Sequence, residues 1–252
     1  LLGVGSQGVV GSSGGTTTTL GRIGTGYIYA DWNGQIAYTT PNMNGFSATV
    51  GVMQPWNVTQ SGTLSATSAG NTDEFGFQGQ ASYSWTGDFA GKVWAGFFTQ
   101  EVTGMTNGAV VPVALTTNTS DTADAYEAGI SATVMNINLV AYGYSGDGVG
   151  TTGLLRDGYD TTGESRDSDG YYVQATYVIP MGTKLGVSYG ESKLDLASGE
   201  AANALVKSNE MLTIGAYHPL TKHLNLVAEY SNVESESHTG VDAESDIFSV
   251  GA

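Results

Sequence analysis

The sequence lacks cysteine, has few basic residues and contains no long apolar run. The absence of cysteine in 252 residues excludes disulfides, thiol nucleophiles and thiolate metal sites. Eight Lys and Arg stand against 24 Asp and Glu, and the resulting net charge of −16 argues against a nucleic-acid partner. The longest apolar candidate, 110–115, contains Pro112 and falls far short of the ~20 residues of a membrane helix. A helical membrane protein is therefore excluded.

Glycine and aromatic residues are abundant. The chain has 37 Gly, 14 Tyr, 7 Phe and 4 Trp, while charged residues make up 13% of it. This composition argues against a disordered chain and against a coiled coil, and it favours a large β structure. One domain over 1–252 can accommodate such a structure. The start, Leu-Leu-Gly-Val-Gly, shows no signal peptide, so we expect a mature chain or a fragment.

Apolar and polar residues alternate with period two from Gly34 onward. We count about eleven segments of roughly ten residues. The clearest is 75–85, in which the odd-numbered residues are mostly apolar or aromatic and the even-numbered ones are Gly, Gln and Ser. We call each of these two alternating sets, which point to opposite faces of a strand, a parity. Only 136–144 has two similarly mixed faces. The final strand is predicted over 243–252.

The connections between these segments alternate in length. The short ones are 42–45, 86–89, 135–136, 180–183 and 219–222, and the long ones are 57–72, 101–122, 146–167, 193–206 and 234–242. Short turns thus lie at one end of the sheet and long loops at the other. This pattern predicts an antiparallel up-and-down meander.

The side chains on the polar face of each predicted strand are mostly small and cannot fill the interior of a large barrel. Aromatic residues concentrate near strand ends, with Phe46, Trp85 and Tyr177 toward the short turns and Trp56, Phe75, Tyr126, Tyr171 and Tyr230 toward the long loops. An outward apolar band between two aromatic girdles, around a polar interior, is typical of a transmembrane β-barrel. We therefore predict an all-β transmembrane antiparallel barrel; a soluble β-sandwich or β-helix is the alternative.

Most acidic residues fall in or beside the long loops. We interpret them either as a solvated rim or as carboxylates that bind divalent cations or concentrate cations at a pore mouth. The weak candidates for a divalent-cation site are Asp157, Asp160, Asp167 and Asp169. The motif Asp-Ser-Asp-Gly at 167–170 begins like a calcium loop but lacks its later acidic ligands.

The stretch 20–56 resembles a known family. It reads LGRIGTGYIYADWNGQIAYTTPNMNGFSATVGVMQPW, and the later DFAGKVWAGFFTQE and NLVAEYSNVES look similar. These segments resemble the Gram-negative general porins. The resemblance implies a trimeric, 16-stranded barrel in the outer membrane of a Gram-negative bacterium. It also implies that 1–25 belongs to the constriction loop and 26–252 to strands six to sixteen. A complete twelve-stranded barrel with a strand over 1–10 is the alternative.

The porin resemblance implies a water-filled channel for ions and small hydrophilic solutes. Expected partners are other copies in a homotrimer, lipopolysaccharide and membrane lipid, and the excess of acids predicts a preference for cations. Strand parity predicts the pore-lining or constriction residues Tyr29, Asp31, Asn33, Gln35, Glu127 and Glu229. Of these, Glu127 and Glu229 are expected in the vestibule near the long loops. Arg22 is the candidate counter-charge to Asp31, for which a loop or rim position is the alternative. The alternative is a non-conducting structural, adhesin or receptor barrel that acts through its acidic loops.

Catalytic patterns are weak. The three histidines, His218, His223 and His238, have no accompanying nucleophile motif. We therefore expect no enzymatic activity and no cofactor.

Overall fold

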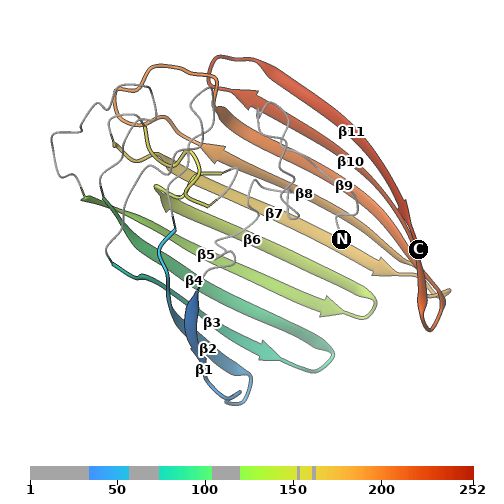
Figure 1. The fold of residues 1–252 in the computed structure, drawn as a ribbon. Helices are drawn as coiled ribbons and strands as arrows, with labels where there is room; N and C mark the ends of the chain where they lie inside the picture. Colours follow the sequence, from blue (N-terminus) through green and yellow to red (C-terminus); the bar gives the residue numbers. More distant parts are fainter. Residues whose placement is uncertain (1–33, 57–73, 104–119, 152–153, 161–162) are drawn as a thin grey trace.

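The computed structural model describes residues 34–56, 74–103, 120–151, 154–160 and 163–252. These residues form one antiparallel sheet in which each strand pairs with the next along the chain (Figure 1). The strands are β1 (Gln35–Thr39), β2 (Phe46–Met53), β3 (Gly76–Trp85), β4 (Phe89–Thr103), β5 (Ser120–Val134), β6 (Ile137–Asp147), β7 (Asp167–Val178), β8 (Lys184–Leu194), β9 (Val206–Thr221), β10 (Leu224–Ser237) and β11 (Asp242–Gly251). The predicted eleven-strand meander is confirmed.

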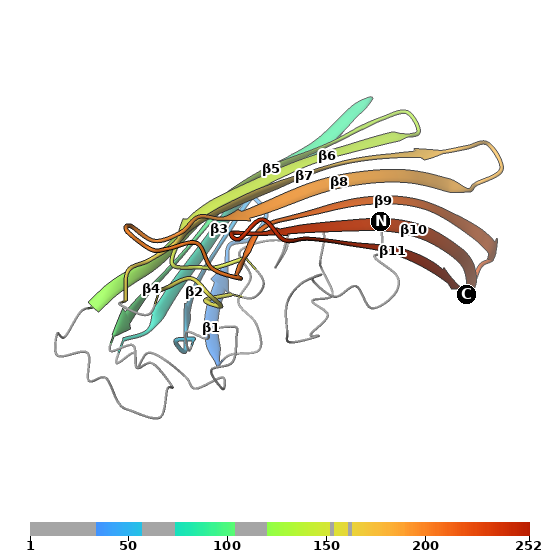
Figure 2. The same ribbon diagram turned by 90° about the horizontal axis from the view of Figure 1, so that it is seen from above.

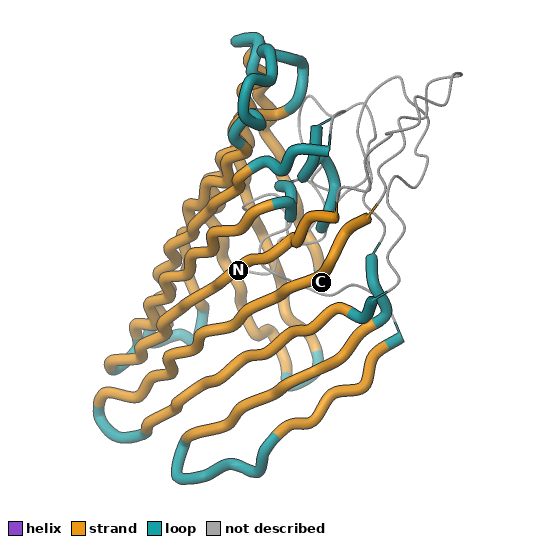
Figure 3. Tube along the Cα trace, turned by 90° about the vertical axis from the view of Figure 1, so that its left-hand side faces the viewer, coloured by secondary structure: helices purple, strands orange, loops and turns teal. Residues whose placement is uncertain are grey.

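The sheet is curved into an arch, with β1 and β11 at its two edges (Figure 2). Short turns gather at one end of the strands, whereas the longer connections gather at the other (Figure 3). No helix in the described ranges has the length and hydropathy needed to cross a membrane. The predicted strand over 1–10 and the constriction loop over 1–25 lie outside the described residues.

The two faces of the sheet have opposite chemistry. Cross-strand register places Tyr126 of β5 beside Phe97 of β4, and along β5 the same face carries Ile130, which is 45% exposed. The opposite face carries small polar residues such as Ser188 and Thr213, which are 1% and 0% exposed. Apolar side chains therefore lie on the outer face. A soluble β-sandwich would bury its apolar face against a second sheet, and no second sheet packs on this one among the described residues. The exposed apolar face therefore contradicts the soluble-sandwich alternative.

Aromatic rings mark both ends of the apolar band. Toward the short turns, Trp85 stacks with Tyr83 and Phe89 at centroid distances of 6.2 and 6.1 Å. Toward the long loops, Tyr171 lies 6.3 Å from Tyr189. These contacts agree with the two predicted girdles.

Trp56 was also predicted to belong to the outer girdle, and this prediction is wrong. Its ring packs against the apolar cluster on the opposite, concave face. Its backbone N–H donates to Gln100 Oε1 at 2.8 Å, and Gln100 Nε2 donates back to the Trp56 carbonyl at 2.7 Å. Two hydrogen bonds to a residue with inward parity thus turn the chain to the concave side after β2.

The mixed pattern of 136–144 has a structural cause. In β6 the inward parity carries Tyr142 and Tyr144, which are 5% and 7% exposed and pack with Trp94 and Tyr172. The outward parity of the same strand carries Ile137 and other apolar residues. Both faces of β6 are therefore apolar or aromatic, and sequence periodicity cannot separate them.

The connection between β6 and β7 folds against the concave face instead of extending as a solvated loop. Its residues Val149, Leu155 and Tyr159 form one buried cluster with wall residues of β2, β4 and β5, namely Met53, Phe98, Val102, Ala123 and Ala125. Leu155 and Tyr159 are both 0% exposed. The expectation of a solvated acidic rim is therefore wrong for this segment, because apolar anchors hold it to the wall.

Candidate functional site

Polar side chains on the concave face are linked across strands. Gln78 Nε2 of β3 donates to Gln35 Oε1 of β1 at 2.8 Å. The carboxylate of Glu127, on β5, accepts from Gln80 Nε2 at 3.0 Å and from the Tyr142 hydroxyl at 2.8 Å. Register explains this reach, because Gln80 pairs with Gly96, which in turn pairs with Glu127.

Gly96 leaves the space in which Gln80 and Glu127 meet. A Cβ at this position would lie 2.8 Å from Glu127 Oε1 and 3.1 Å from the carbonyl oxygen of Gly79. A recess of about 230 Å³ near this point is lined by Thr49, Gln78, Gly79, Gln80, Phe97 and Glu127. An alanine at position 96 would press on the Glu127 carboxylate and push it aside.

Glu229 is a second carboxylate on this face. It accepts a hydrogen bond from the Tyr217 hydroxyl and is 2% exposed. Both glutamates lie well within their strands, β5 over Ser120–Val134 and β10 over Leu224–Ser237. The expected vestibule placement is therefore wrong, because both strands continue further toward the long loops than periodicity alone indicated.

The other predicted pore-lining residues are only partly covered by the structure. Gln35 has the concave-face partner described above. Four predicted residues, Arg22, Tyr29, Asp31 and Asn33, lie outside the described residues.

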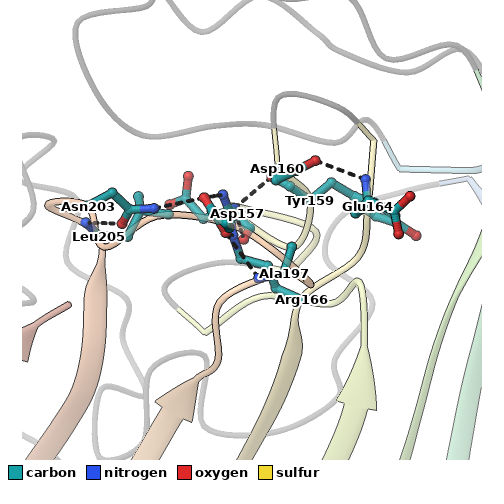
Figure 4. A network of polar contacts seen from close by, with 9 residues as sticks. Asp157, Tyr159, Asp160, Glu164, Arg166, Ala197, Asn203 and Leu205 are labelled. Atoms are coloured by element: carbon teal, nitrogen blue, oxygen red, sulfur yellow. Dashed lines mark hydrogen bonds and ion pairs between the residues drawn. The ribbon is translucent and has the colours of Figure 1, made fainter.

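Arg166 joins the folded-in connection to the loop between β8 and β9 (Figure 4). Its Nε donates to Glu200 Oε2 at 2.8 Å and its Nη2 to Glu200 Oε1 at 2.5 Å. Its Nη1 donates to the carbonyl oxygens of Asp157 and Tyr159 at 2.8 and 2.6 Å. Hydrogen bonding from Arg166 holds the pKa of the Glu200 carboxyl below its ordinary value. Sequence reasoning missed this pair, whose members lie 34 residues apart.

The four candidate divalent-cation ligands are not brought to one place. Asp157 and Asp160 are buried in the connection that folds against the concave face, at 5% and 7% exposure. Asp167 and Asp169 lie on β7 with the outward parity of Tyr171. Within the described ranges no group of three or more His, Asp or Glu side chains is placed to hold a metal ion.

A row of glutamates crosses the outer face at the long-loop end. Glu191 of β8 pairs with Glu210 of β9, Glu210 with Glu234 of β10, and Glu234 with Glu244 of β11. A recess of about 510 Å³ is lined by three of these and by Ser208, Ser235, Glu236, Asp242 and Ala243. Glu191 pairs with Tyr171 of β7 and lies two residues beyond Tyr189, so the row begins at the level of the aromatic girdle.

Comparison with known proteins gives one family and two structural neighbours. A family profile described as Gram-negative porin matches residues 2–238. The outer membrane channel DcaP of Acinetobacter baumannii superposes with a TM-score of 0.67 at 14% identity, covering 86% of this chain and 60% of that one. An anion-selective porin from Comamonas acidovorans gives 0.50 at 13% identity, covering 86% and 59%. Comparison with curated proteins found no match. The chain thus spans about three fifths of the length of these neighbours.

Proposed function

The chain belongs to the Gram-negative porin family, and we propose that it forms part of the wall of a water-filled diffusion channel. As a member of this family it is an outer-membrane protein. The observation that carries the proposal is the opposite chemistry of the two faces. Exposed apolar side chains on the outer face suit acyl chains, while amides, hydroxyls and carboxylates on the concave face suit an aqueous path. Ions and small hydrophilic solutes would cross by passive diffusion.

Single-channel recording tests this proposal. Protein reconstituted into a planar bilayer should produce discrete current steps in simple salt solutions. A non-conducting structural, adhesin or receptor barrel would insert, as shown by protease protection of its strands, without producing steps. That outcome would refute the channel.

Cation preference is the finer part of the proposal. Glu127 and Glu229 are the acidic residues on the concave face well within their strands, whereas Lys92 and Lys184 lie near the short turns. Carboxylates within a narrow aqueous path raise the local cation concentration. Reversal potentials in a salt gradient should favour cations and shift toward zero in Glu127→Gln and Glu229→Gln. A reversal potential of anion-selective sign would refute this preference.

Assembly and envelope contacts complete the proposal. Family membership supports a homotrimer, which should run as a high-mass band in unheated gels and as a monomer after heating. The outer-face glutamate row begins at the aromatic girdle, the level expected for lipid headgroups, where divalent cations would bridge it to lipopolysaccharide. Binding of purified lipopolysaccharide should then depend on Mg²⁺ and weaken when Glu210 and Glu234 are both changed to Gln.

A further inference from the structure

We propose that the concave recess beside Gly96 is a binding site for small organic cations that carry a primary ammonium or guanidinium group. This inference rests on the proposed channel and adds a solute class to it. The recess is lined by residues of the neighbouring strands β2 to β5, and the Glu127 carboxylate and the amides of Gln78 and Gln80 reach it with concave-face parity. Its volume of about 230 Å³ is smaller than that of drug-sized pockets and suits a small solute.

The recess offers hydrogen-bond acceptors beside the Glu127 carboxylate. Gln78 and Gln80 each use the amide nitrogen as a donor, to Gln35 and to Glu127. Each amide also has a carbonyl oxygen, which can accept a hydrogen bond from a ligand, and a second N–H. An ammonium group has three N–H donors and no acceptor, and a guanidinium group likewise only donates.

Glu127 supplies a negative charge that forms no ion pair with the described residues. The ion pairs in the described part of the chain involve Arg156, Arg166, Lys193 and Lys207, and none includes Glu127. Its two hydrogen bonds come from neutral groups, Tyr142 and Gln80, which orient the carboxylate without adding a positive charge. Each carboxylate oxygen accepts more than one hydrogen bond, so a cationic donor can be added to those present.

Accessibility distinguishes Glu127 from the second carboxylate of this face. Glu127 is half-buried and Gln80 is exposed. Glu229 is 2% exposed and is hydrogen-bonded by Tyr217. A solute on the concave side can therefore reach the first carboxylate and not the second. Gly96 is a specificity-determining residue because its missing side chain makes the room beside Glu127.

Three small solutes of different charge test the proposal: the cation butylammonium, the anion butyrate and the neutral glucose, added at millimolar concentrations to single channels of the full protein. Butylammonium should interrupt the current in a concentration-dependent manner, and butyrate and glucose should not. Glu127→Gln should raise the apparent dissociation constant of butylammonium about tenfold, the loss expected for a hydrogen bond to a charged group. Gly96→Ala should raise it in the same direction. Asp88→Asn, in a short turn outside the recess, provides the matched loss of one negative charge and should leave it unchanged.

The outcomes separate this inference from the channel itself. Steps that butylammonium does not interrupt would overturn the site and leave the channel standing. Interruption by glucose or butyrate alone, or equal interruption in Glu127→Gln and wild type, would also overturn it. Insertion without current steps would instead refute the channel. In that case, binding of butylammonium to protein in detergent, measured by saturation-transfer NMR in wild type and Glu127→Gln, decides the site by itself.

Discussion

Arg166 and Glu200 form a two-point ion pair between two different loops, with N–O distances of 2.8 and 2.5 Å. The side chains are 5% and 14% exposed. Glu200 also accepts from the backbone N–H of Ala197 and from Asn203 Nδ2, at 3.0 and 2.8 Å. Together these bonds fix the segment between β6 and β7 over the concave face at its β7 end.

Glu200→Gln should loosen this attachment. Removing one member of a buried pair leaves the other charge uncompensated, at a cost of about 3 kcal/mol. Trypsin should then cut after Arg166 in the folded protein, because the arginine is 4% exposed in the wild type. Glu164→Gln, an exposed acid in the same segment, is the control and should leave cleavage slow. Equal rates in the two variants would contradict a role for the pair.

Acid should weaken the same attachment. The pKa of the Glu200 carboxyl is lowered from its ordinary value of 4.5, so its contribution to stability is complete above that pH and is lost as pH falls through the lower, folded-state pKa. Amide hydrogen exchange, corrected for intrinsic rates, should show protection of Leu155 and Arg166 falling below about pH 4.5. Glu200→Gln should remove that part of the pH dependence. An identical fall in this variant would assign it to other groups.

The apolar anchor is the second attachment of the segment. Leu155→Ala should cost about 2–5 kcal/mol of docking free energy, since the side chain is fully buried in the cluster. We expect lower exchange protection from 148 to 166 and greater open-channel current noise. Val241→Ala, at a position 66% exposed in a turn, is the control. Unchanged noise with lost protection would mean that this segment does not border the ion path.

Neighbouring residues on β5 test the assignment of the two faces. Ile130 points outward, midway along the apolar band, and Ser131 points to the concave face. Ile130→Arg should destabilise the protein in phospholipid vesicles by about 2–4 kcal/mol, as for a charge at the bilayer midplane. Ser131→Arg should change it far less. Urea unfolding in vesicles measures both, and equal losses would contradict the assignment.

Sequence periodicity predicted the strands well because one face of each had to meet lipid and the other water. In β3 the alternation of Phe77, Tyr83 and Trp85 with polar residues identified both the strand and its outer face. It failed for the segment after β6, whose acids Asp157 and Asp160 suggested a solvated loop. The apolar residues Val149 and Leu155 were the available signal, but their partners on β2, β4 and β5 are set by the tertiary fold.

The candidate site was predictable only in part. Parity predicted that Gln35, Glu127 and Glu229 share one face, and the structure places all three there. The partners of the carboxylates depend on register and on a missing side chain at Gly96, and no periodic pattern encodes either. Their position within the strands was missed because strand ends rich in Asp, Ser and Thr resemble loops.

The pairing of β4 with β5 runs without a shift from Phe89 with Val134 to Thr103 with Ser120. Adding or deleting one residue inside this ladder would turn every side chain beyond it to the opposite face of the sheet. The Tyr126 ring would then lie in water and the Glu127 carboxylate among acyl chains. The unshifted ladder therefore tolerates a change in chain length far less well than the connections between strands do.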